Sequence, residues 1–333
     1  MKKDLITKGR QYKANLHCHS TISDGKMTPE QIKDRYKSEG YSVVAYTDHD
    51  IMIPHLELCD DEFIALTGYE VEINQTSQDT DSLYKKVCHM CFVAKTPDIK
   101  NQVCWHREKY LFGNAPQYQD KACFNESLPD FERIYTPECI NEMIKRAKEG
   151  GYFVTYNHPT WSLEEYPDYM AYEGMDAMEI VNYACIVSGY PEYNARVFDD
   201  MLRGGKKVYC VAADDNHSMA NSCGGFVMIS ADALEYCKIT KALEEGKFYA
   251  SEGPIIDELW YEDGKLHIKC SPVRQICFCC GKRRTRSQSA NGELLTEAVF
   301  ELPPEYGYVR VSLIDESGKH ADTQAYYQQD LQD

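Results

Sequence analysis

The chain has 333 residues, of which 43% are hydrophobic and 27% are charged, and its formal net charge is −17. This length exceeds that of one small domain and suits a barrel of roughly 250 residues with an additional module. The negative charge disfavours binding to a nucleic-acid backbone, which requires Lys and Arg, although bound divalent ions would still admit a phosphorylated small molecule.

The sequence also bears on location and redox state. No stretch approaches the ~20 apolar residues of a membrane span, and residues 1–10 lack the apolar core of a signal peptide. We therefore expect a cytoplasmic protein without membrane association. The 15 cysteines are an odd number, and without an export signal we expect reduced thiols. Cys88/Cys91 and Cys277/Cys280 have C-x-x-C spacing, which alone is a weak zinc signal.

Short apolar runs alternate with polar residues and helix-like segments through the first three-quarters of the chain. The seven runs are 13–19, 42–47, 62–71, 86–94, 151–157, 176–182 and 207–213. Helices are predicted at about 28–39, 136–150, 191–204 and 230–245, the first opened by a capping box of Thr28 with Gln31. The alternation predicts parallel βα units and the α/β fold class, with one large domain at 1–253.

Two segments depart from this alternation. Residues 96–135 are aromatic and polar without a clean period, and we expect an inserted lid or wall near the site, or else a surface excursion packed on its own aromatics. Residues 254–333 contain turn signals and five strand-like runs, which predict a small β-sandwich-like domain with a frayed tail after residue 324. The basic stretch 282–286 is expected to be a solvated loop or a contact for an acidic partner.

Histidines and carboxylates recur at or just after the ends of the runs. They are His17, His19, Asp24, Asp48, His49, Glu70, His89, His158, Asp215 and His217. In a parallel barrel all the carboxyl ends of the strands lie on one face, so these side chains would gather at one mouth. Asp24 could instead be a turn residue, Asp48 could orient His49, and Asp214 could exchange roles with Asp215.

This set of residue types indicates a metal centre. Imidazole and carboxylate ligands without thiolate suit Zn, Mn or Fe, and the number of ligands is too large for one ion. We therefore expect two to three divalent ions, an arrangement that typically performs hydrolysis.

The residues together resemble the PHP (polymerase and histidinol phosphatase) superfamily. The matching motifs are His17-x-His19 with Asp24, Thr47–Asp48–His49–Asp50, Glu70, His89, Asn157–His158–Pro159 and Asp215-x-His217. The resemblance implies a distorted seven-stranded (βα)7 TIM-like barrel, two or three metal ions and phosphoester hydrolysis. The junction at 246–254 and the β tail resemble the branch that includes carbaryl-hydrolase-like proteins.

The resemblance also implies roles for the ligands. His17, His19, Glu70 and Asp215 would hold one ion, Glu70 would bridge to a second ion held by His89 and His158, and Asp24, His49 and His217 would hold a third. His89 is the least certain ligand, because it lies in mid-run between two cysteines.

The remaining functional residues are less strongly indicated. Asp48 or a metal-bound water is expected to act as the catalytic acid, and a metal-bound water held by His17, His19 and Glu70 is expected to be the nucleophile. Arg196, Asn157 and Trp161 are expected to bind substrate, although Arg196 could be a solvated helix residue and Trp161 a packing residue. Arg107 and Lys109 are alternative phosphate ligands.

The function expected from the sequence is hydrolysis of a small phosphorylated metabolite, either a phosphomonoester or a nucleotide-like molecule, by a metal-activated hydroxide. Two alternatives stay open. One is an ester or carbamate hydrolase that uses the same metal cluster, and the other is a metal-containing binding module with vestigial activity.

Overall fold

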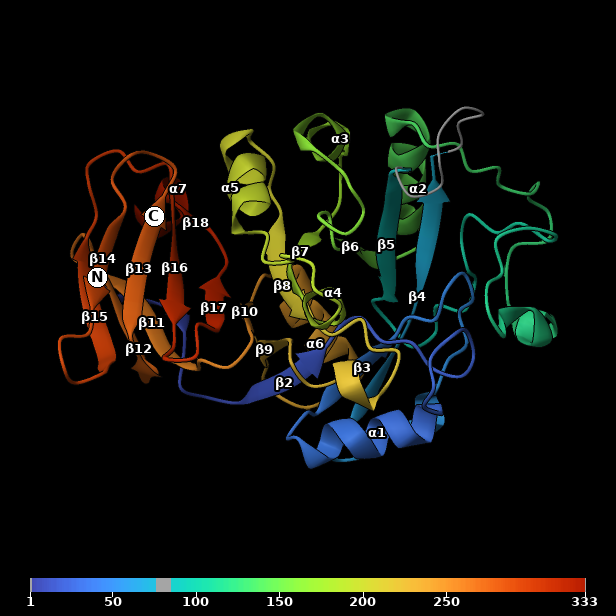
Figure 1. The fold of residues 1–333 in the computed structure, drawn as a ribbon, viewed down its shortest axis with the longest axis horizontal. Coiled ribbons are helices and arrows are strands. Elements are labelled where there is room, and N and C mark those ends of the chain that lie inside the picture. Colours follow the sequence, from blue (N-terminus) through green and yellow to red (C-terminus); the bar gives the residue numbers. More distant parts are fainter. Residues whose placement is uncertain (1, 76–84, 333) are drawn as a thin grey trace.

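The structure, a computed structural model, describes residues 2–75 and 85–332. All seven predicted runs contain strands, and β9 and β10 extend the same sheet before the C-terminal strands begin (Figure 1). These strands are β2 (Gln11–Asn15), β3 (Val43–Tyr46), β4 (Ile64–Asn74), β5 (Val87–Ala94), β6 (Tyr152–Tyr156), β7 (Ala177–Asn182), β8 (Tyr209–Ala213), β9 (Phe226–Ser230) and β10 (Phe248–Ser251).

The strand directions differ from the prediction at one position. β2, β3 and β4 are parallel to one another, as are β6, β7 and β8. β5 is antiparallel to both of its neighbours, β4 and β6, and β9 is antiparallel to β2. The expectation of uniformly parallel units is therefore wrong for β5. Since β5 begins where β4 ends, a residue near its start lies at the same end of the sheet as the carboxyl ends of the other strands.

The sheet is barrel-like but does not close. Its hydrogen-bonded order runs β9-β2-β3-β4-β5-β6-β7-β8, and within the described part of the chain no ladder joins β8 to β9. The Gln324 side chain occupies part of this seam: its Oε1 accepts from the Cys210 N–H (2.7 Å), and its Nε2 donates to the carbonyls of Cys210 (2.9 Å) and Phe248 (3.3 Å). The expected fraying from residue 324 is therefore wrong, because Gln324 is a buried link between β8 and β10.

The helices pack around this sheet and close one end of it. Longer helices are α1 (Pro29–Ser38), α2 (Pro137–Glu149), α5 (Ala195–Arg203) and α6 (Tyr236–Glu244), and short ones are α3 (Tyr166–Ala171), α4 (Tyr183–Val187), α7 (Gln328–Gln332), η1 (Leu56–Leu58), η3 (Ala115–Lys121) and η4 (Met219–Asn221). Ile239 and Leu243 of α6 join Val43, Phe153 and Val211 in one buried core. α6 starts at Tyr236, later than predicted, because Ser230 still belongs to β9 and a bend follows it before the helix begins.

The C-terminal part is an antiparallel sandwich. One layer contains β1 (Lys2–Ile6), β11 (Ile256–Glu262), β12 (Lys265–Val273) and β15 (Leu295–Glu301). The other contains β13 (Gln275–Cys280), β14 (Arg286–Ser289), β16 (Tyr308–Ile314), β17 (His320–Thr323) and β18 (Tyr326–Tyr327), and it continues the main sheet because β17 pairs with β10. The domain boundary at 253/254 stays a prediction, to which the pairing of the N-terminal strand β1 with β11 is an addition.

Candidate metal centre

The predicted ligands converge at one end of the barrel-like sheet. Three overlapping groups have ligand atoms within 4.8 Å of one another: His17, His19, Glu70 and Asp215; His19, Asp24, His49 and His217; and His49, Glu70 and His89. His158 lies beside them, with Nε2 3.4 Å from Glu70 Oε1 and 3.9 Å from Asp215 Oδ2. The structure thus brings together all nine residues expected to bind metal.

Strand geometry explains this convergence. His17 and His19 follow β2 and lie on either side of Cys18, whose N–H donates to Thr47 Oγ1 (2.9 Å) beside β3. Two isolated parallel bridges add to this pairing: one joins Cys18, after β2, to Asn216, after β8, and the other joins His49, after β3, to Glu70. These bridges hold the ligand-bearing loops in register.

The antiparallel direction of β5 accounts for His89, the least certain predicted ligand. His89 lies directly opposite Glu72 of β4 in the ladder. Its Nδ1 is 3.2 Å from Glu70 Oε1 and its Nε2 is 3.6 Å from Glu72 Oε2. A residue near the start of β5 therefore reaches the same centre as residues at the ends of parallel strands.

Glu70 lies at the middle of the cluster. Its two oxygens lie 3.2 Å from His17 Nε2, 3.2 Å from His49 Nδ1 and 3.3 Å from His19 Nε2. Asn157, which was expected to bind substrate, donates its Nδ2 proton to Glu70 Oε1 (2.7 Å). One fully buried carboxylate is thus within reach of several imidazoles, as a bridging ligand requires.

The chemistry of the donor set fits divalent cations. His17 Nδ1 lies 2.7 Å from Glu179 Oε1 and His17 Nε2 lies 3.1 Å from His19 Nε2, so in its neutral form the ring would carry its proton on Nδ1 and leave the Nε2 lone pair free for a metal ion. Buried atoms at the centre lack a hydrogen-bond partner, among them His19 Nδ1, His89 Nε2 and Asp215 Oδ1. Unpartnered buried polar atoms are costly, and convergent lone pairs around carboxylates are the arrangement that a cation satisfies.

The pKa values of two histidines diverge within this cluster. Burial, together with the charge of His19, lowers the pKa of His49 to about 3. Burial also lowers the pKa of His158, but its hydrogen bond to Glu70 and the charge of Asp215 raise the value to about 9. The ring of His49 is therefore neutral and offers a lone pair, whereas His158 attracts a proton that a divalent ion would displace.

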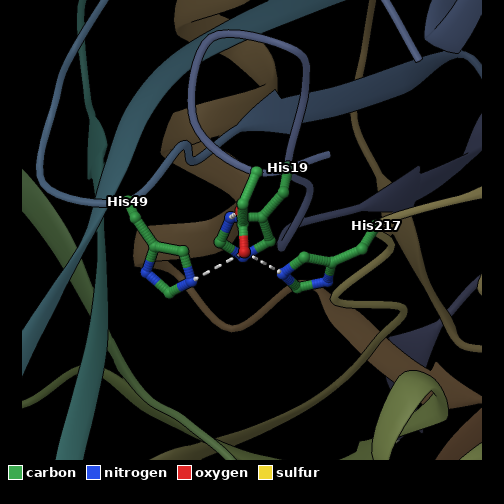
Figure 2. Close-up of side chains that lie close together, drawn as sticks. His19, His49 and His217 are labelled. Atoms are coloured by element: carbon green, nitrogen blue, oxygen red, sulfur yellow. Dashed lines mark ion pairs between the residues drawn. The ribbon is translucent and has the colours of Figure 1, made fainter. Parts of the chain in front are cut away.

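Asp24 belongs to the cluster and is more than a turn residue. The side chains of His19, His49 and His217 point toward a common centre (Figure 2), and Asp24 Oδ2 lies 3.2 Å from His217 Nε2 and 3.9 Å from His49 Nε2. The following Gly25 approaches the backbone so closely that an added Cβ would lie 2.4 Å from the His19 carbonyl oxygen. A glycine is therefore needed where the loop brings Asp24 back to His19.

Two of the ligands sit on a left-handed backbone. His158 has φ 24° and Asp215 has φ 52°. Asp adopts this region more readily than His does, and such conformations persist only where the surroundings impose them. Here the His158 N–H donates to Glu179 Oε2 (2.9 Å) and the Asp215 N–H donates to the His17 carbonyl (3.0 Å).

The two uncertain aspartates have different environments from the ligands. Asp48 accepts hydrogen bonds from the N–H and hydroxyl groups of both Ser20 and Ser23, at 2.8 to 3.1 Å. Asp214 accepts from the backbone of Gly224 (2.8 Å) and Gly225 (2.7 Å), among others, and belongs to none of the three groups, whereas Asp215 belongs to one. The acid role of Asp48 stays a prediction that this saturated carboxylate does not favour.

The centre opens into a cleft of about 410 Å³. Trp161, expected to bind substrate, lines this cleft, whereas Asn157 and Arg196 do not. Arg196 is exposed on α5 and paired with Asp200, so the structure does not bring it to the centre. The insertion 96–135 contributes Phe112 to the wall, where its ring meets His49 edge-on.

Two important residues were absent from the prediction. Glu179 holds His17 and His158 in place, and its signal was a carboxylate within the apolar run 176–182, since a buried acid needs a partner. Phe112 had no distinguishing signal, because its position depends on how the insertion folds. The Asn114 N–H donates to the Ser23 carbonyl (2.7 Å), which docks the insertion on the loop that carries Asp24.

Comparisons with known proteins give distant matches. No protein-family model matches the chain. Over 66 residues the chain is 38% identical to the 5'-3' exoribonuclease of Haemophilus influenzae, a stretch that is 19% of this chain and 24% of that relative. A solved two-domain protein from Bacteroides vulgatus, containing a predicted PHP-like metal-dependent phosphoesterase, matches at 14% identity and a TM-score of 0.48, covering 97% of this chain and 96% of that one.

A second solved structure, from Bifidobacterium adolescentis and provisionally described as a metal-dependent phosphoesterase, matches at 16% identity and a TM-score of 0.38, covering 61% of this chain and 87% of that one. Because both TM-scores are below 0.5, the case for a metal centre rests on the buried ligand cluster. Among the described residues, no helix is both long and apolar enough to cross a membrane.

Proposed function

We propose that this chain is a metal-dependent phosphoesterase of the PHP type that hydrolyses a small phosphomonoester. The observation that carries the proposal is the set of three overlapping, largely buried groups of imidazoles and carboxylates around Glu70, at the base of an open cleft. Ligands of this type held close together suit two or three ions of Zn, Mn or Fe. When bound, such ions supply Lewis acidity and lower the pKa of a water molecule.

The candidate ligands can be assigned to three ions so that each histidine binds a single ion. A neutral imidazole ligates through one lone pair, whereas a carboxylate offers two oxygens and can bridge. His17, His19, Glu70 and Asp215 would hold the first ion, Glu70, His89 and His158 the second, and Asp24, His49 and His217 the third. This division uses each histidine once and shares only Glu70, although the close groups themselves overlap in His19 and His49 as well.

The surrounding residues orient the ligands. Glu179 receives the Nδ1 proton of His17, and Asn157 donates to one oxygen of Glu70. His217 Nδ1 lies 2.9 Å from the Asp215 carbonyl, which leaves Nε2 directed at Asp24. Asp48 fixes the loop from Ser20 to Ser23, so its role in this proposal is positional. Such outer partners set ring tautomers and ligand basicity.

We propose a small molecule as the substrate. The described residues that line the cleft include neither Lys nor Arg, and the chain carries a net charge of −17. A nucleic-acid strand would have no cationic track outside the metal ions. Single-stranded RNA nevertheless belongs in the substrate panel, because the matched relative is named an exoribonuclease.

The test is a panel of phenyl phosphate, phenyl acetate, a phenyl carbamate and single-stranded RNA, assayed after purification without chelators and after addition of Mn²⁺, Zn²⁺ or Fe²⁺. We expect metal-dependent hydrolysis of phenyl phosphate that is lost in His19→Ala. His55→Ala is the matched control, because His55 is also buried but belongs to none of the three groups.

Other outcomes separate the alternatives. Faster cleavage of the acetate or carbamate with the same His19 dependence would make the chain an ester or carbamate hydrolase. Tightly held metal without turnover of any panel member would favour a binding module. Metal-free protein that gains no activity on metal addition would contradict the proposal altogether.

A further inference from the structure

The walls of the cleft carry information about the substrate beyond the phosphoryl group, and the following inference rests on the proposed function. Among the described residues, four carboxylates line the cleft: those of Asp24, Glu70, Glu72 and Asp215. Three divalent ions against these four carboxylates would leave an excess of two positive charges, which one phosphomonoester dianion neutralises. A second anionic group on the substrate would therefore find no remaining positive charge at the ions.

Three cationic side chains of the insertion 96–135 pair with carboxylates and are not free to meet a substrate. The Arg133 side chain is 4% exposed and pairs with Asp50 at 2.6 Å. Arg107 pairs with Asp130 at 2.6 Å, and Lys109 pairs with Glu132 at 2.8 Å. The two insertion residues considered from the sequence as phosphate ligands thus have partners within the insertion, and neither lines the cleft.

Glu72 makes the cleft less favourable still for a second anion. Its side chain is 30% exposed, and its Oε2 lies 3.6 Å from His89 Nε2. Unlike Glu70, it belongs to none of the three metal groups, and it lines the cleft that the substrate enters. A carboxylate or second phosphate on the substrate would meet this charge at short range.

Two exposed aromatic rings complete the walls. Phe112 is 53% exposed and Trp161 is 37% exposed, and both line the cleft. Each is held on an anchored loop: the Asn114 N–H beside Phe112 donates to the Ser23 carbonyl (2.7 Å), and the Trp161 N–H donates to the buried Glu192 (2.8 Å). Fixed, exposed rings next to a reactive centre are typical of a site that receives an apolar or aromatic group.

We propose that the cleft selects a phosphomonoester with one anionic group, whose alcohol part carries an aromatic ring that packs against Phe112 and Trp161, and that Glu72 excludes substrates with a second anion. The cleft volume of about 410 Å³ lies in the lower part of the range for small-molecule sites, roughly 300–1,000 Å³. The substrate is therefore a compact molecule with a single aromatic system.

The experiment compares three alkyl phosphates whose leaving groups have similar basicity: ethyl phosphate, benzyl phosphate and 4-carboxybenzyl phosphate. We expect kcat/KM of the metal-loaded protein to be roughly tenfold higher for benzyl than for ethyl phosphate, and to fall by roughly tenfold when the carboxylate is added. Phe112→Ala and Trp161→Ala should each reduce the benzyl-to-ethyl ratio by roughly three- to tenfold. Glu72→Gln should recover part of the loss caused by the carboxylate.

A binding measurement and a matched control keep the interpretation clear. Calorimetric titration with benzylphosphonate and ethylphosphonate, which cannot be hydrolysed, should show the same preference in Kd. Tyr166→Ala is the control, because Tyr166 is 54% exposed but does not line the cleft, and it should leave the ratio unchanged. Equal kcat/KM for ethyl and benzyl phosphate, or for benzyl and carboxybenzyl phosphate, overturns this inference alone. Failure to hydrolyse every phosphate overturns the proposed function and this inference with it.

Discussion

Two buried clusters of charged residues differ in whether protein side chains alone satisfy their charges and hydrogen bonds. In the first, which we call the Arg310 network, Arg310 donates to both oxygens of Asp199 (3.0 and 2.9 Å) and to Asp322 (2.9 Å), and thereby joins α5 to the C-terminal sandwich. In the second, the metal centre, buried atoms such as His19 Nδ1 and Asp215 Oδ1 have no hydrogen-bond partner.

The comparison separates a structural joint from a binding site. A buried charge is tolerated when opposite charge and hydrogen bonds surround it, and this condition is met in the Arg310 network by side chains alone. The metal centre gathers imidazoles and carboxylates, and the described residues that line its cleft include no Lys or Arg. Its arrangement is explained by cations from solution, so the two clusters should respond in opposite ways to substitution.

The largest expected effect is the loss of metal in Asp215→Asn. Removing a charged ligand should lower metal affinity by more than the ~100-fold that substitution of an outer partner typically causes. The free energy of unfolding of the metal-free protein should fall by less than in Arg310→Met, because Asn keeps the shape of Asp and can still accept a hydrogen bond from Asn182 Nδ2 (3.2 Å in the parent). Elemental analysis and urea unfolding measure the two quantities.

Asp214→Asn is the matched control for this substitution. Asp214 accepts backbone N–H groups from Gly224 and Gly225, so the change should lower the free energy of unfolding by about 1–3 kcal/mol while the bound metal stays the same. Retention of metal in Asp215→Asn together with its loss in Asp214→Asn would reverse the assignment of the two residues.

The Arg310 network should show the opposite response. Arg310→Met leaves the carboxylates of Asp199 and Asp322 without their partner, and we expect the free energy of unfolding to fall by about 3–5 kcal/mol. The metal content of the folded protein should not change. Denaturant unfolding of the metal-loaded protein tests this, and loss of metal with little loss of stability would erase the distinction between the clusters.

The carboxylate of Glu164 is buried outside both clusters, and its ionisation should make the free energy of unfolding depend on pH. Burial raises the pKa of Glu164 from 4.5 to about 7, although hydrogen bonds from Tyr156, Tyr172 and Tyr135 lower it. Because the folded state holds this proton more tightly than the unfolded state, the associated stability is present below pH 4.5 and is lost as pH rises through about 7. The total change is up to about 3 kcal/mol.

Glu164→Gln should remove this component of the pH dependence. The measurement is the free energy of unfolding at intervals between pH 4.5 and 7.5, in parent and variant. Parallel curves for the two proteins would show that Glu164 is ionised in the fold throughout this range.

The smallest of these effects is expected at Glu179, which supports the metal centre without belonging to its ligand groups. Glu179→Gln would weaken the hold on the Nδ1 proton of His17, and we expect metal affinity to fall by roughly 10- to 100-fold. Competition with a chelator of known affinity measures the change. An unchanged affinity would mean that His17 is oriented by other contacts.

The strand runs and the convergence of the candidate ligands were predictable from sequence, for a local reason. His17, His19 and Asp215 follow short apolar runs, and the end of a strand can be read from residue pattern alone. His89 also reaches the centre as predicted, but the residue pattern did not indicate why. It does so because β5 is antiparallel, and that direction depends on tertiary pairing with β4 and β6.

Other features depend on contacts between distant segments. Gln324 donates hydrogen bonds to β8 and β10 across more than seventy intervening residues, whereas the polar composition of its segment had predicted a frayed tail. Arg196 lies on the helix expected from the sequence, but it faces solvent beside Asp200 because that helix packs outside the cleft. Phe112 is placed by the docking of Asn114 on the Asp24 loop. Local pattern does not encode these long-range pairings.

The most direct test of the central claim is the metal content of the protein. We predict two to three equivalents of Zn, Mn or Fe per chain by elemental analysis after purification without chelators, or after reconstitution and dialysis. One equivalent should be lost in His217→Ala, since His217 belongs only to the group that contains Asp24. A chain that retains no divalent metal under either condition, and whose activity does not change when metal is added, would contradict the account.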